Sequence, residues 1–566
     1  MKRILILVVS IIALVLCLSI VSSAEDVIRR GVWRNLNWEL NETTGELTIS
    51  GEGIMDEFRQ NSNNAWLAYK DKIKTVKIEE GITRVGFRAF ENCTNLVSVD
   101  IPDSMENSFC EEAFYGCVSL ENINVKDSNP WFTTVDGVVY SKDKKTLICY
   151  PKGKTATEFT IPDTVLYIGM SAFYESAHLE SITIPDSVER IDFFAFSYCT
   201  GLVNILIPDS ITGLSNAFPG CTSLESVKLP DNITSIDSSM FYGCSSLKSI
   251  TIPKGVTRIG HEAFFGCESL TSIEIPDSVT EIGSFAFADC KSLTSIEIPD
   301  GVTTINSRTF SGCSSLTNIK IPDNVTDIKR EAFLGCESLV SIEIPDGVTS
   351  INESTFAECK SLESVKLSDA VTSIGKNAFS GCEGLVSMEI PNAVTSIGKN
   401  AFSGCEGLVS VEIPNAVTSI DDNAFSDCDN LKLVIIKSDA IVSQILRTNS
   451  CGKLIINAIS VIVPNGSEVS VYFANKYTGI ENISIDGAEY TVYSDHDHTW
   501  EVLEILKQPT KKEEGEQRVV CTDCSVEKTE AIPMLEGCGG GGGATAAFIS
   551  SGGISLVWFA LKRKKI

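Results

Sequence analysis

Four residues near the C-terminus have the types and spacing of a small metal site. His496 and His498 lie about 20 residues before Cys521 and Cys524. Two imidazole nitrogens and two thiolates complete the tetrahedral shell that a structural Zn²⁺ prefers. A disulfide between the two cysteines, or two free thiols, are the alternatives that the sequence leaves open. Zinc in this module is the one cofactor that we consider, and no other is expected.

A second set of charged residues recurs every 23 residues, at one place of a repeated sequence. Each member lies between two apolar residues, as Glu274 lies between Ile273 and Ile275, so strand alternation turns it to the solvent face. Such a row can bind a cation or a basic partner. The alternative is a solvated sheet face in which two lysines relieve repulsion. This charged row, our candidate ligand-binding site, consists of Glu274, Glu297, Lys320, Glu343, Lys366, Glu389 and Glu412.

Residues for catalysis are scarce. The chain has only four histidines, and two of them, His178 and His261, are isolated within repeats. This scarcity weakens any Ser/His/Asp or Cys/His mechanism. No phosphate loop, zinc-protease helix or nucleophile elbow is present in the sequence. We therefore expect no enzyme and name no catalytic residue.

The charge balance argues against nucleic-acid binding. The formal net charge is −28, whereas binding to phosphates requires clustered Lys and Arg side chains that displace counterions. An acidic, self-repelling surface keeps a long chain soluble.

The residues above belong to an internal repeat built around Phe-x-x-Cys. From Phe218 to Phe425 the phenylalanine recurs every 23 residues without a slip. Equal spacing of this kind is typical of solenoids, in which each unit buries its apolar residues only against its neighbours. The sequence therefore predicts a repeat solenoid over residues 71–436.

One unit shows how each coil forms. Residues 270–276 alternate apolar and polar, which predicts a strand, and Pro276 ends it because proline has no amide donor. Ala286, Phe287 and Cys290 predict a short helical turn that closes the coil. The expected fold is thus one parallel β-strand plus a short helical turn per 23-residue coil.

Most of the 20 cysteines lie in this repeat. Disulfides form in chains that are secreted into an oxidising environment, but equivalent side chains of stacked coils point in parallel and not toward one another. Ser176 also takes the cysteine place once. We therefore expect buried free thiols, which pack as small apolar groups.

The repeat resembles that of the BspA-type leucine-rich-repeat surface proteins. The matching pattern, Leu-x-Ser-Ile-x-Ile-Pro-Asp-x-Val-Thr-x-Ile-x-x-x-Ala-Phe-x-x-Cys, is found in residues 270–290. A β-hairpin island at about residues 127–160, which contains Asn129-Pro130-Trp131 and Asp136-Gly137-Val138-Val139-Tyr140, resembles insertions of that family. The resemblance implies a bacterial or protozoal cell-surface protein used in adhesion, and it implies no catalytic residue.

The flanks of the array differ in composition from the repeats. Residues 25–70 and 437–495 keep strand-like alternation without the period, so we expect a β cap at each end of the solenoid. Residues 496–535 form the small CxxC module described first.

Both termini carry membrane signals. Residues 1–24 have a basic start, an apolar run and a small-x-small pattern, which predict a secretory signal peptide. An uncleaved anchor or a lipoprotein signal are the alternatives. Residues 537–566 contain a glycine-rich linker, an uncharged stretch and a basic end, which predict a transmembrane anchor with the repeats outside. A flexible tail is the alternative there.

Three functions fit these features. The first is a cell-surface, adhesin-like binding protein that recognises an extracellular protein or glycoprotein. The second is a structural envelope spacer, which near-identical repeats such as 375–391 and 398–414 also fit. The third is a surface carbohydrate-handling enzyme, which would need a pocket that interrupts the regular array. We favour the first.

Overall fold

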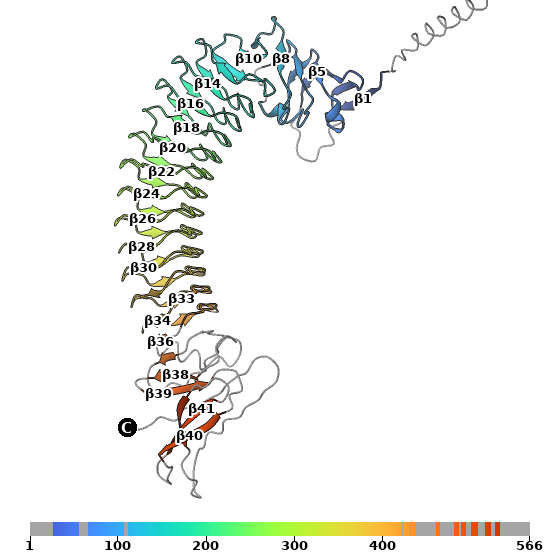
Figure 1. The fold of residues 1–566 in the computed structure, drawn as a ribbon. Helices are drawn as coiled ribbons and strands as arrows, with labels where there is room; N and C mark the ends of the chain where they lie inside the picture. Colours follow the sequence, from blue (N-terminus) through green and yellow to red (C-terminus); the bar gives the residue numbers. More distant parts are fainter. Residues whose placement is uncertain are drawn as a thin grey trace, which may run out of the picture. The chain divides into compact units, whose positions relative to one another are not determined.

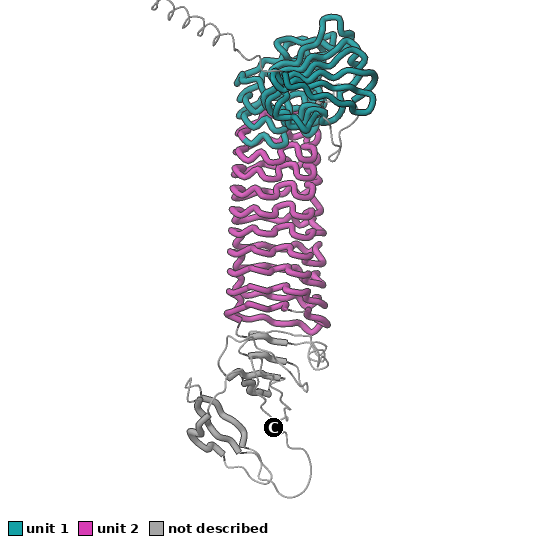
Figure 2. The backbone as a smooth tube through the Cα atoms, turned by 90° about the vertical axis from the view of Figure 1, so that its right-hand side faces the viewer, with its two compact units in different colours: residues 1–222 teal, residues 223–566 magenta. Residues whose placement is uncertain are grey.

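A computed structural model describes residues 26–55, 66–106, 111–421 and 423–431, and seven further strands between residues 433 and 532. The expected signal peptide, 1–24, and the expected anchor, 537–566, lie outside the described residues. The chain divides into two compact units, residues 1–222 and residues 223–566 (Figure 2). Each unit is described by itself below.

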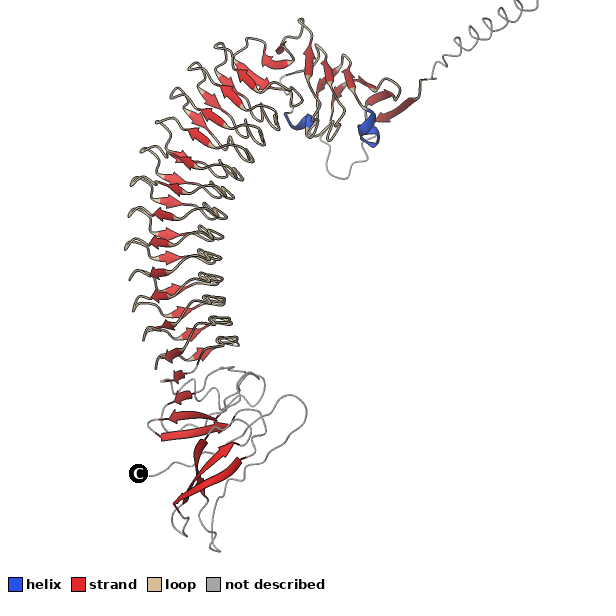
Figure 3. Cartoon of the chain, viewed as in Figure 1, coloured by secondary structure: helices blue, strands red, loops and turns tan. Residues whose placement is uncertain are grey.

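The array is a β-solenoid of about 15 coils with almost no helix, which confirms the predicted repeat solenoid. A regular coil carries two short strands, and the rest of the coil consists of turns (Figure 3). Strands of the same kind in successive coils pair in parallel, as β24 and β26 do through Ile296 and Ile319.

Among the described residues of unit 1, the elements are the first 17 strands and two 3-10 helices (Figure 1). Their bounds are β1 Ile28–Trp33, β2 Leu36–Asn41, β3 Glu46–Gly51, β4 Gly53–Ile54, η1 Leu67–Lys72, β5 Thr75–Ile78, β6 Ile82–Arg84, β7 Ser98–Ile101, η2 Glu111–Phe114, β8 Asn122–Val125, β9 Phe132–Val135, β10 Val138–Ser141, β11 Thr146–Cys149, β12 Glu158–Thr160, β13 Tyr167–Ile168, β14 Ser181–Thr183, β15 Arg190–Ile191, β16 Asn204–Leu206 and β17 Gly213–Leu214.

The elements of unit 2 are strands only, among its described residues. Their bounds are β18 Ser226–Lys228, β19 Ser235–Ile236, β20 Ser249–Ile250, β21 Arg258–Ile259, β22 Ser272–Ile273, β23 Glu281–Ile282, β24 Ser295–Glu297, β25 Thr304–Ile305, β26 Asn318–Lys320, β27 Asp327–Ile328, β28 Ser341–Glu343, β29 Ser350–Ile351, β30 Ser364–Lys366, β31 Ser373–Ile374, β32 Ser387–Met388, β33 Ser396–Ile397, β34 Ser410–Ile413, β35 Ser419–Ile420, β36 Leu433–Ile436, β37 Ser460–Val463, β38 Ile480–Ile485, β39 Ala488–Tyr493, β40 Trp500–Lys507, β41 Gly515–Cys521 and β42 Glu527–Ile532.

The structure corrects the expected helical turn of each coil. Residues 284–289 form turns, because Phe285 and Asp289 have φ angles of 58° and 57°, which no right-handed helix accommodates. The amide of Phe287 donates to the carbonyl of Thr309 in the next coil at 2.9 Å. The amide of Cys290 instead donates to the Phe287 carbonyl, three residues back, at 3.3 Å. Backbone donors therefore alternate between the turn and the neighbouring coil, and no helix propagates.

The core of each coil is filled by its Phe-x-x-Cys residues. Within unit 2 the phenylalanine rings stack in parallel, with centroids of Phe287 and Phe310 at 5.8 Å and an interplanar angle of 3°. The cysteines beside them are buried and form no disulfide. The thiol of Cys290 donates to the carbonyl oxygen of Phe264, in the preceding coil, at 3.3 Å. The buried thiols thus have hydrogen-bond acceptors without forming disulfides.

The first strands of unit 1 occupy the segment expected as an N-terminal cap. β1, β2 and β3 pair antiparallel, and β3 then pairs in parallel with β5, the first strand of the array. The segment expected as an island contains β9, β10 and β11, which pair antiparallel. β11 pairs in parallel with β13, so the island shares a sheet with the coils that follow it.

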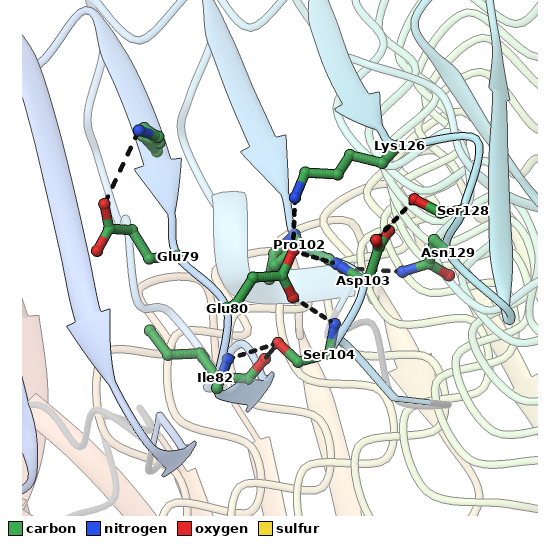
Figure 4. A network of polar contacts seen from close by, with 11 residues as sticks. Glu79, Glu80, Ile82, Pro102, Asp103, Ser104, Lys126, Ser128 and Asn129 are labelled. Atoms are coloured by element: carbon green, nitrogen blue, oxygen red, sulfur yellow. Dashed lines mark hydrogen bonds and ion pairs between the residues drawn. The ribbon is translucent and has the colours of Figure 1, made fainter.

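A network of polar contacts ties three successive chain segments together just before the island (Figure 4). The Glu80 carboxylate accepts the backbone N–H groups of Asp103 and Ser104 at 3.2 and 3.0 Å. It also accepts a hydrogen bond from Lys126, and this contact lowers the pKa of Glu80 to about 2. The fully buried Asn129 donates to the carbonyl of Pro102 at 2.8 Å. These bonds fix the turn from which the island begins.

The segment expected as a C-terminal cap contains β37, β38 and β39. β36, β37 and β38 continue the parallel pairing of β34, and β39 folds back antiparallel on β38. β40, β41 and β42 form a separate antiparallel sheet in the segment expected as the CxxC module.

Candidate functional site

The charged row lies along one face of the parallel strands of unit 2. β22, β24, β26, β28 and β30 succeed one another along the array (Figure 1). The row residue lies in each of these strands, or directly after it at Glu274. It is exposed, and the residue before it is buried, as Ile296 is. All seven residues named from the sequence therefore point away from the core. Their side chains are exposed at Glu274, Glu297, Lys320, Glu343, Lys366, Glu389 and Glu412.

Strand register places neighbours of the row directly beside one another. Glu297 is the register partner of Lys320, and Glu343 is the register partner of Lys366. The Lys366 ammonium donates to the Glu343 carboxylate, which raises the pKa of Lys366. About three quarters of the Lys366 side chain is exposed, so water and salt screen this pair and it contributes little to stability.

The two ends of the row differ from its middle. Glu274 pairs through a single parallel bridge with Thr251, a neutral neighbour. Met388 of β32 is the register partner of Val411 of β34. Glu389 and Glu412 directly follow these two residues, so two negative charges are neighbours there. The row therefore alternates in sign at its centre and is acidic toward its ends.

A row of small polar residues accompanies the charged row, and the sequence interpretation did not single it out. Ser272, Ser295 and Asn318 are register partners and are exposed two positions before the charged residues. Strand alternation is the signal that reveals this row, because residues two apart share a face. The face thus offers hydroxyl and amide groups beside its charges, which suits hydrogen bonding to a polar partner.

Charged side chains elsewhere on the coils of unit 2 also pair with the next coil. Lys291 pairs with Glu268 and Lys360 pairs with Glu337, each at 2.7 Å between nitrogen and oxygen. The hydrogen bond to its glutamate raises the pKa of each lysine. Cross-coil pairing is therefore a general property of this surface, and the alternative of a solvated face stays open for the charged row.

Each coil has a second short strand besides the one beside the charged row, such as β27 and β29. An open cavity of about 520 Å³ lies around β27 and β29. Three of its charged side chains form ion pairs, since Lys329 contacts Asp327 and the Glu353 carboxylate lies 2.7 Å from Lys376. The cavity is polar and holds no histidine or cysteine. It is lined by Ser307, Thr326, Asp327, Lys329, Arg330, Thr349, Ser350, Asn352 and Glu353.

The zinc prediction falls on residues for which the structure gives no side chains. His496, His498 and Cys524 lie outside the described residues, and Cys521 is placed only as part of β41. Over the described ranges, no group of three or more His, Cys, Asp or Glu residues is arranged to hold a metal ion. Zinc in the CxxC module thus stays a prediction.

No helix in the described part of the chain has both the length and the apolar character needed to cross a bilayer. The stretch that we expect to act as an anchor falls within residues 537–566, which the description does not include.

Comparison with protein families gives one match. The model for the BspA type leucine rich repeat region, in six copies, matches residues 62–141, 149–267, 234–363 and 326–449. These ranges include the charged row and most of the island. No curated protein matches the chain.

Several solved structures are similar to the chain. A leucine-rich repeat protein from Bacteroides ovatus is 29% identical, with 73% of this chain and 96% of that chain covered and a TM-score of 0.49. A leucine rich cell surface protein from Faecalibacterium prausnitzii is 26% identical over 76% of this chain and 100% of that chain, with a TM-score of 0.36. The pneumococcal vaccine antigen PcpA is 19% identical over 74% of this chain and 96% of that chain, with a TM-score of 0.37.

Proposed function

Because the chain belongs to the BspA-type leucine-rich-repeat family, we propose that it is a cell-surface binding protein of the adhesin type. Its solenoid recognises an extracellular protein or glycoprotein, and its C-terminal segment anchors it in the membrane with the repeats outside. The observation that carries this proposal is the charged row, an ordered line of exposed charges on one face of unit 2.

The geometry of the row suits an extended partner. Parallel strands place successive row residues about 4.8 Å apart. The backbone pairing of these strands fixes that spacing. A single exposed ion pair is worth about 0–1 kcal/mol, so affinity requires several residues of the row to bind together. The row therefore supports weak, salt-sensitive binding that avidity strengthens, with a basic segment of the partner along the acidic ends.

A structural spacer is the main alternative. A spacer needs only the stacked core, and the near-identical coils at 375–391 and 398–414 would serve it equally well. A spacer does not need the pattern of positive and negative charges in the row. Replacing the carboxylates of the row would therefore weaken partner binding only if the chain is a binding protein.

The experiment is to display the full-length chain on cells and probe them with an array of extracellular matrix proteins and host glycoproteins. The matched variant replaces Glu274, Glu297, Glu343, Glu389 and Glu412 with Gln. We expect the wild-type chain to retain at least one arrayed protein and the variant to retain less of it. Equal retention by both chains would leave the row as a solvated face, and retention by neither would support the spacer.

The membrane proposal has its own test. Cells expressing the chain without residues 537–566 should release it to the medium, whereas cells expressing the full chain should keep it with the membrane fraction, accessible to added protease. Retention of the shortened chain at the cell surface would contradict the anchor.

A further inference from the structure

We propose that unit 1 carries a binding site for the apolar face of a neutral sugar. The site is a surface formed by Met170, Tyr174, Phe193, Phe194 and Tyr198, which we call the aromatic platform. It lies within unit 1 and shares no residue with the charged row of unit 2. It therefore stands or falls separately from the proposed function.

The platform exposes large apolar side chains together. Phe193 is 50% exposed, Tyr198 47%, Met170 46% and Phe194 40%. Met170 and Phe193 occupy equivalent positions of successive coils, and the backbone N–H of Ser171 donates to the Phe193 carbonyl at 3.0 Å. The Phe193 and Phe194 rings are neighbours, with centroids 6.5 Å apart. Exposed apolar side chains grouped in this way on a folded protein mark a place where another molecule binds.

Two of these aromatic residues have a backbone conformation that bulky side chains avoid. Phe194 and Tyr198 have φ angles of 59° and 57°, in the left-handed region where Cβ crowds the following carbonyl oxygen. The next coil has Asn216 and Gly220 at the same positions, residue types that tolerate this conformation. Positive φ at these two places recurs in most coils, as at Ser171 of the preceding coil, so the platform coil is distinguished by placing bulky, exposed aromatic side chains there.

A third aromatic residue with positive φ shows how such a ring is otherwise accommodated. The ring of Phe285 in unit 2 lies under the Arg308 guanidinium, whose carbon is 5.2 Å from the ring centroid. The His261 ring meets it edge-on at 5.6 Å. Phe285 is accordingly only partly exposed, whereas Phe194 and Tyr198 keep much of their surface open to solvent.

Neighbouring rings, glycine backbone and a buried lysine fix the position of the two tyrosine rings of the platform. The Tyr198 and Tyr174 rings meet edge to face with centroids 5.6 Å apart. A Cβ atom at Gly220 would lie 2.6 Å from the Tyr198 ring, so this ring rests directly on glycine backbone. The buried Lys152 ammonium lies 5.0 Å from the Tyr174 ring centroid and 2.6 Å from the Glu175 carboxylate. Rings positioned in advance lose little conformational freedom when a ligand binds.

The charges around the platform are paired, which favours a neutral ligand. Glu175 pairs with Lys152, and Asp192, directly before Phe193, pairs with Arg190 at 2.8 Å. A chain of net charge −28 repels anions at long range. The Arg190–Asp192 pair remains partly exposed and provides donors and acceptors for hydroxyl groups at the platform edge.

A sugar fits this chemistry better than a protein surface. One face of a pyranose ring presents C–H groups with partial positive charge, which the negative face of an aromatic ring attracts. The hydroxyl groups around the sugar ring then reach the polar edge. A stable protein interface needs roughly 20–30 residues on each side, whereas five side chains match one or two sugar rings.

The test uses the full-length chain, purified in a mild detergent, and isothermal titration with neutral hexasaccharides. These are built from β-1,4-glucose, α-1,4-glucose, β-1,4-mannose, β-1,4-galactose and β-1,4-N-acetylglucosamine. The variant Phe193→Ser/Phe194→Asn/Tyr198→Gly introduces the residues that the next coil has. We expect at least one hexasaccharide to bind the wild-type chain with Kd below about 1 mM, and the variant to lose at least about tenfold in affinity. Its melting temperature should be unchanged or higher, because Asn and Gly relieve the strained φ angles.

The matched control is Leu206→Thr, which removes an exposed apolar side chain of the same unit and should leave sugar affinity unchanged. The single variant Tyr198→Gly replaces the triple variant if the triple variant does not fold. No binding of any hexasaccharide to the wild-type chain would overturn the proposal, and so would equal binding by variant and wild type. Loss of a protein ligand in the variant, without sugar binding by the wild-type chain, would assign the platform to a protein partner and likewise overturn the proposal.

Discussion

In most Phe-x-x-Cys sequences the cysteine is both buried and hydrogen-bonded to the coil before it. The Cys313 sulfur lies 3.1 Å from the carbonyl oxygen of Phe287. Burial raises the pKa of the Cys313 thiol from 9.0 to about 12, and burial does the same for Cys359. The thiolate, which is the reactive form of cysteine, is therefore scarce in the folded chain.

The raised thiol pKa predicts alkaline unfolding. A group whose pKa is higher in the folded state stabilises the fold fully below its unfolded pKa, and this contribution is lost as pH rises toward the folded pKa. For Cys313 the window runs from about 9 to about 12. Because one such thiol recurs in nearly every coil, we expect the denaturant midpoint, followed by circular dichroism, to fall steeply above pH 9. Iodoacetamide at pH 8 should label the repeat cysteines only after unfolding, as mass spectrometry would show. A flat midpoint between pH 9 and 12 would contradict the buried-thiol account.

The Glu80 network gives a second residue-scale prediction. The hydrogen bond from Lys126 lowers the pKa of Glu80 from 4.5 to about 2, so its contribution is present above pH 4.5 and is lost as pH falls through 2. Half of the Glu80 side chain is exposed, so screening limits the gain to less than about 1 kcal/mol. Glu80→Gln should speed hydrogen exchange at the Asp103 and Ser104 amides at pH 7, measured by NMR, with a difference from wild type that vanishes near pH 2.

The neighbouring Glu79 provides the control for this network. It lies 3.8 Å from Lys77 and belongs to the same turn. Glu79→Gln should leave exchange at Asp103 and Ser104 unchanged, whereas faster exchange in this variant would show that any lost charge loosens the turn.

At the scale of elements, the phenylalanine stack holds one coil to the next. Phe310 lies between Phe287 and Phe333, with ring centroids at 5.8 and 5.5 Å, and is fully buried. Phe310→Ala should cost about 3–5 kcal/mol through lost burial and the cavity left behind. Denaturant unfolding of the full chain would measure this cost.

A surface substitution in the next coil serves as the comparison. Val340 is 41% exposed at a position that Thr317 fills one coil earlier. Val340→Thr should change stability by less than about 0.5 kcal/mol. Similar losses for Phe310→Ala and Val340→Thr would mean that the ring stack does not hold the coils together.

The coil was predictable from the sequence where side-chain burial decides its structure. The alternation around Glu274 fixes a strand, because a shift by one residue would expose Ile273 and Ile275. The closing turn was not predictable in the same way, because its apolar spacing fits a helix equally well. What excludes a helix is positive φ at residues such as Phe285, and a phenylalanine gives no sign of this conformation. The aromatic platform was missed for the same reason, since Phe194 and Tyr198 look like core residues in the sequence.

At the scale of the whole molecule, stacked coils should be removable one at a time. Residues 375–397 and 398–420 differ only at Met388 and Val411, so deleting 398–420 leaves each junction with its native neighbours. Since stability in such arrays is a sum of coil and interface terms, the shortened chain should fold with a small loss of stability. Deleting residues 398–409 instead breaks the register and should unfold the adjacent coils. Circular dichroism and thermal melting of both chains would show whether the coil is the cooperative unit.

Recognition through the charged row is the central claim, and its most direct test is the association rate at two ionic strengths. The partner is the protein retained by wild-type cells, and surface plasmon resonance gives its rate constants with the full chain. Changing rim charges acts mainly on association and on its salt dependence. Gln at Glu274, Glu297, Glu343, Glu389 and Glu412 should therefore slow association about tenfold at low salt and flatten its salt dependence. The control variant should associate like wild type. It carries Gln at five exposed glutamates outside the row, which are Glu268, Glu281, Glu337, Glu383 and Glu406. Equal rates and salt slopes for the row variant and wild type would contradict the claim, leaving the row as a solvated face.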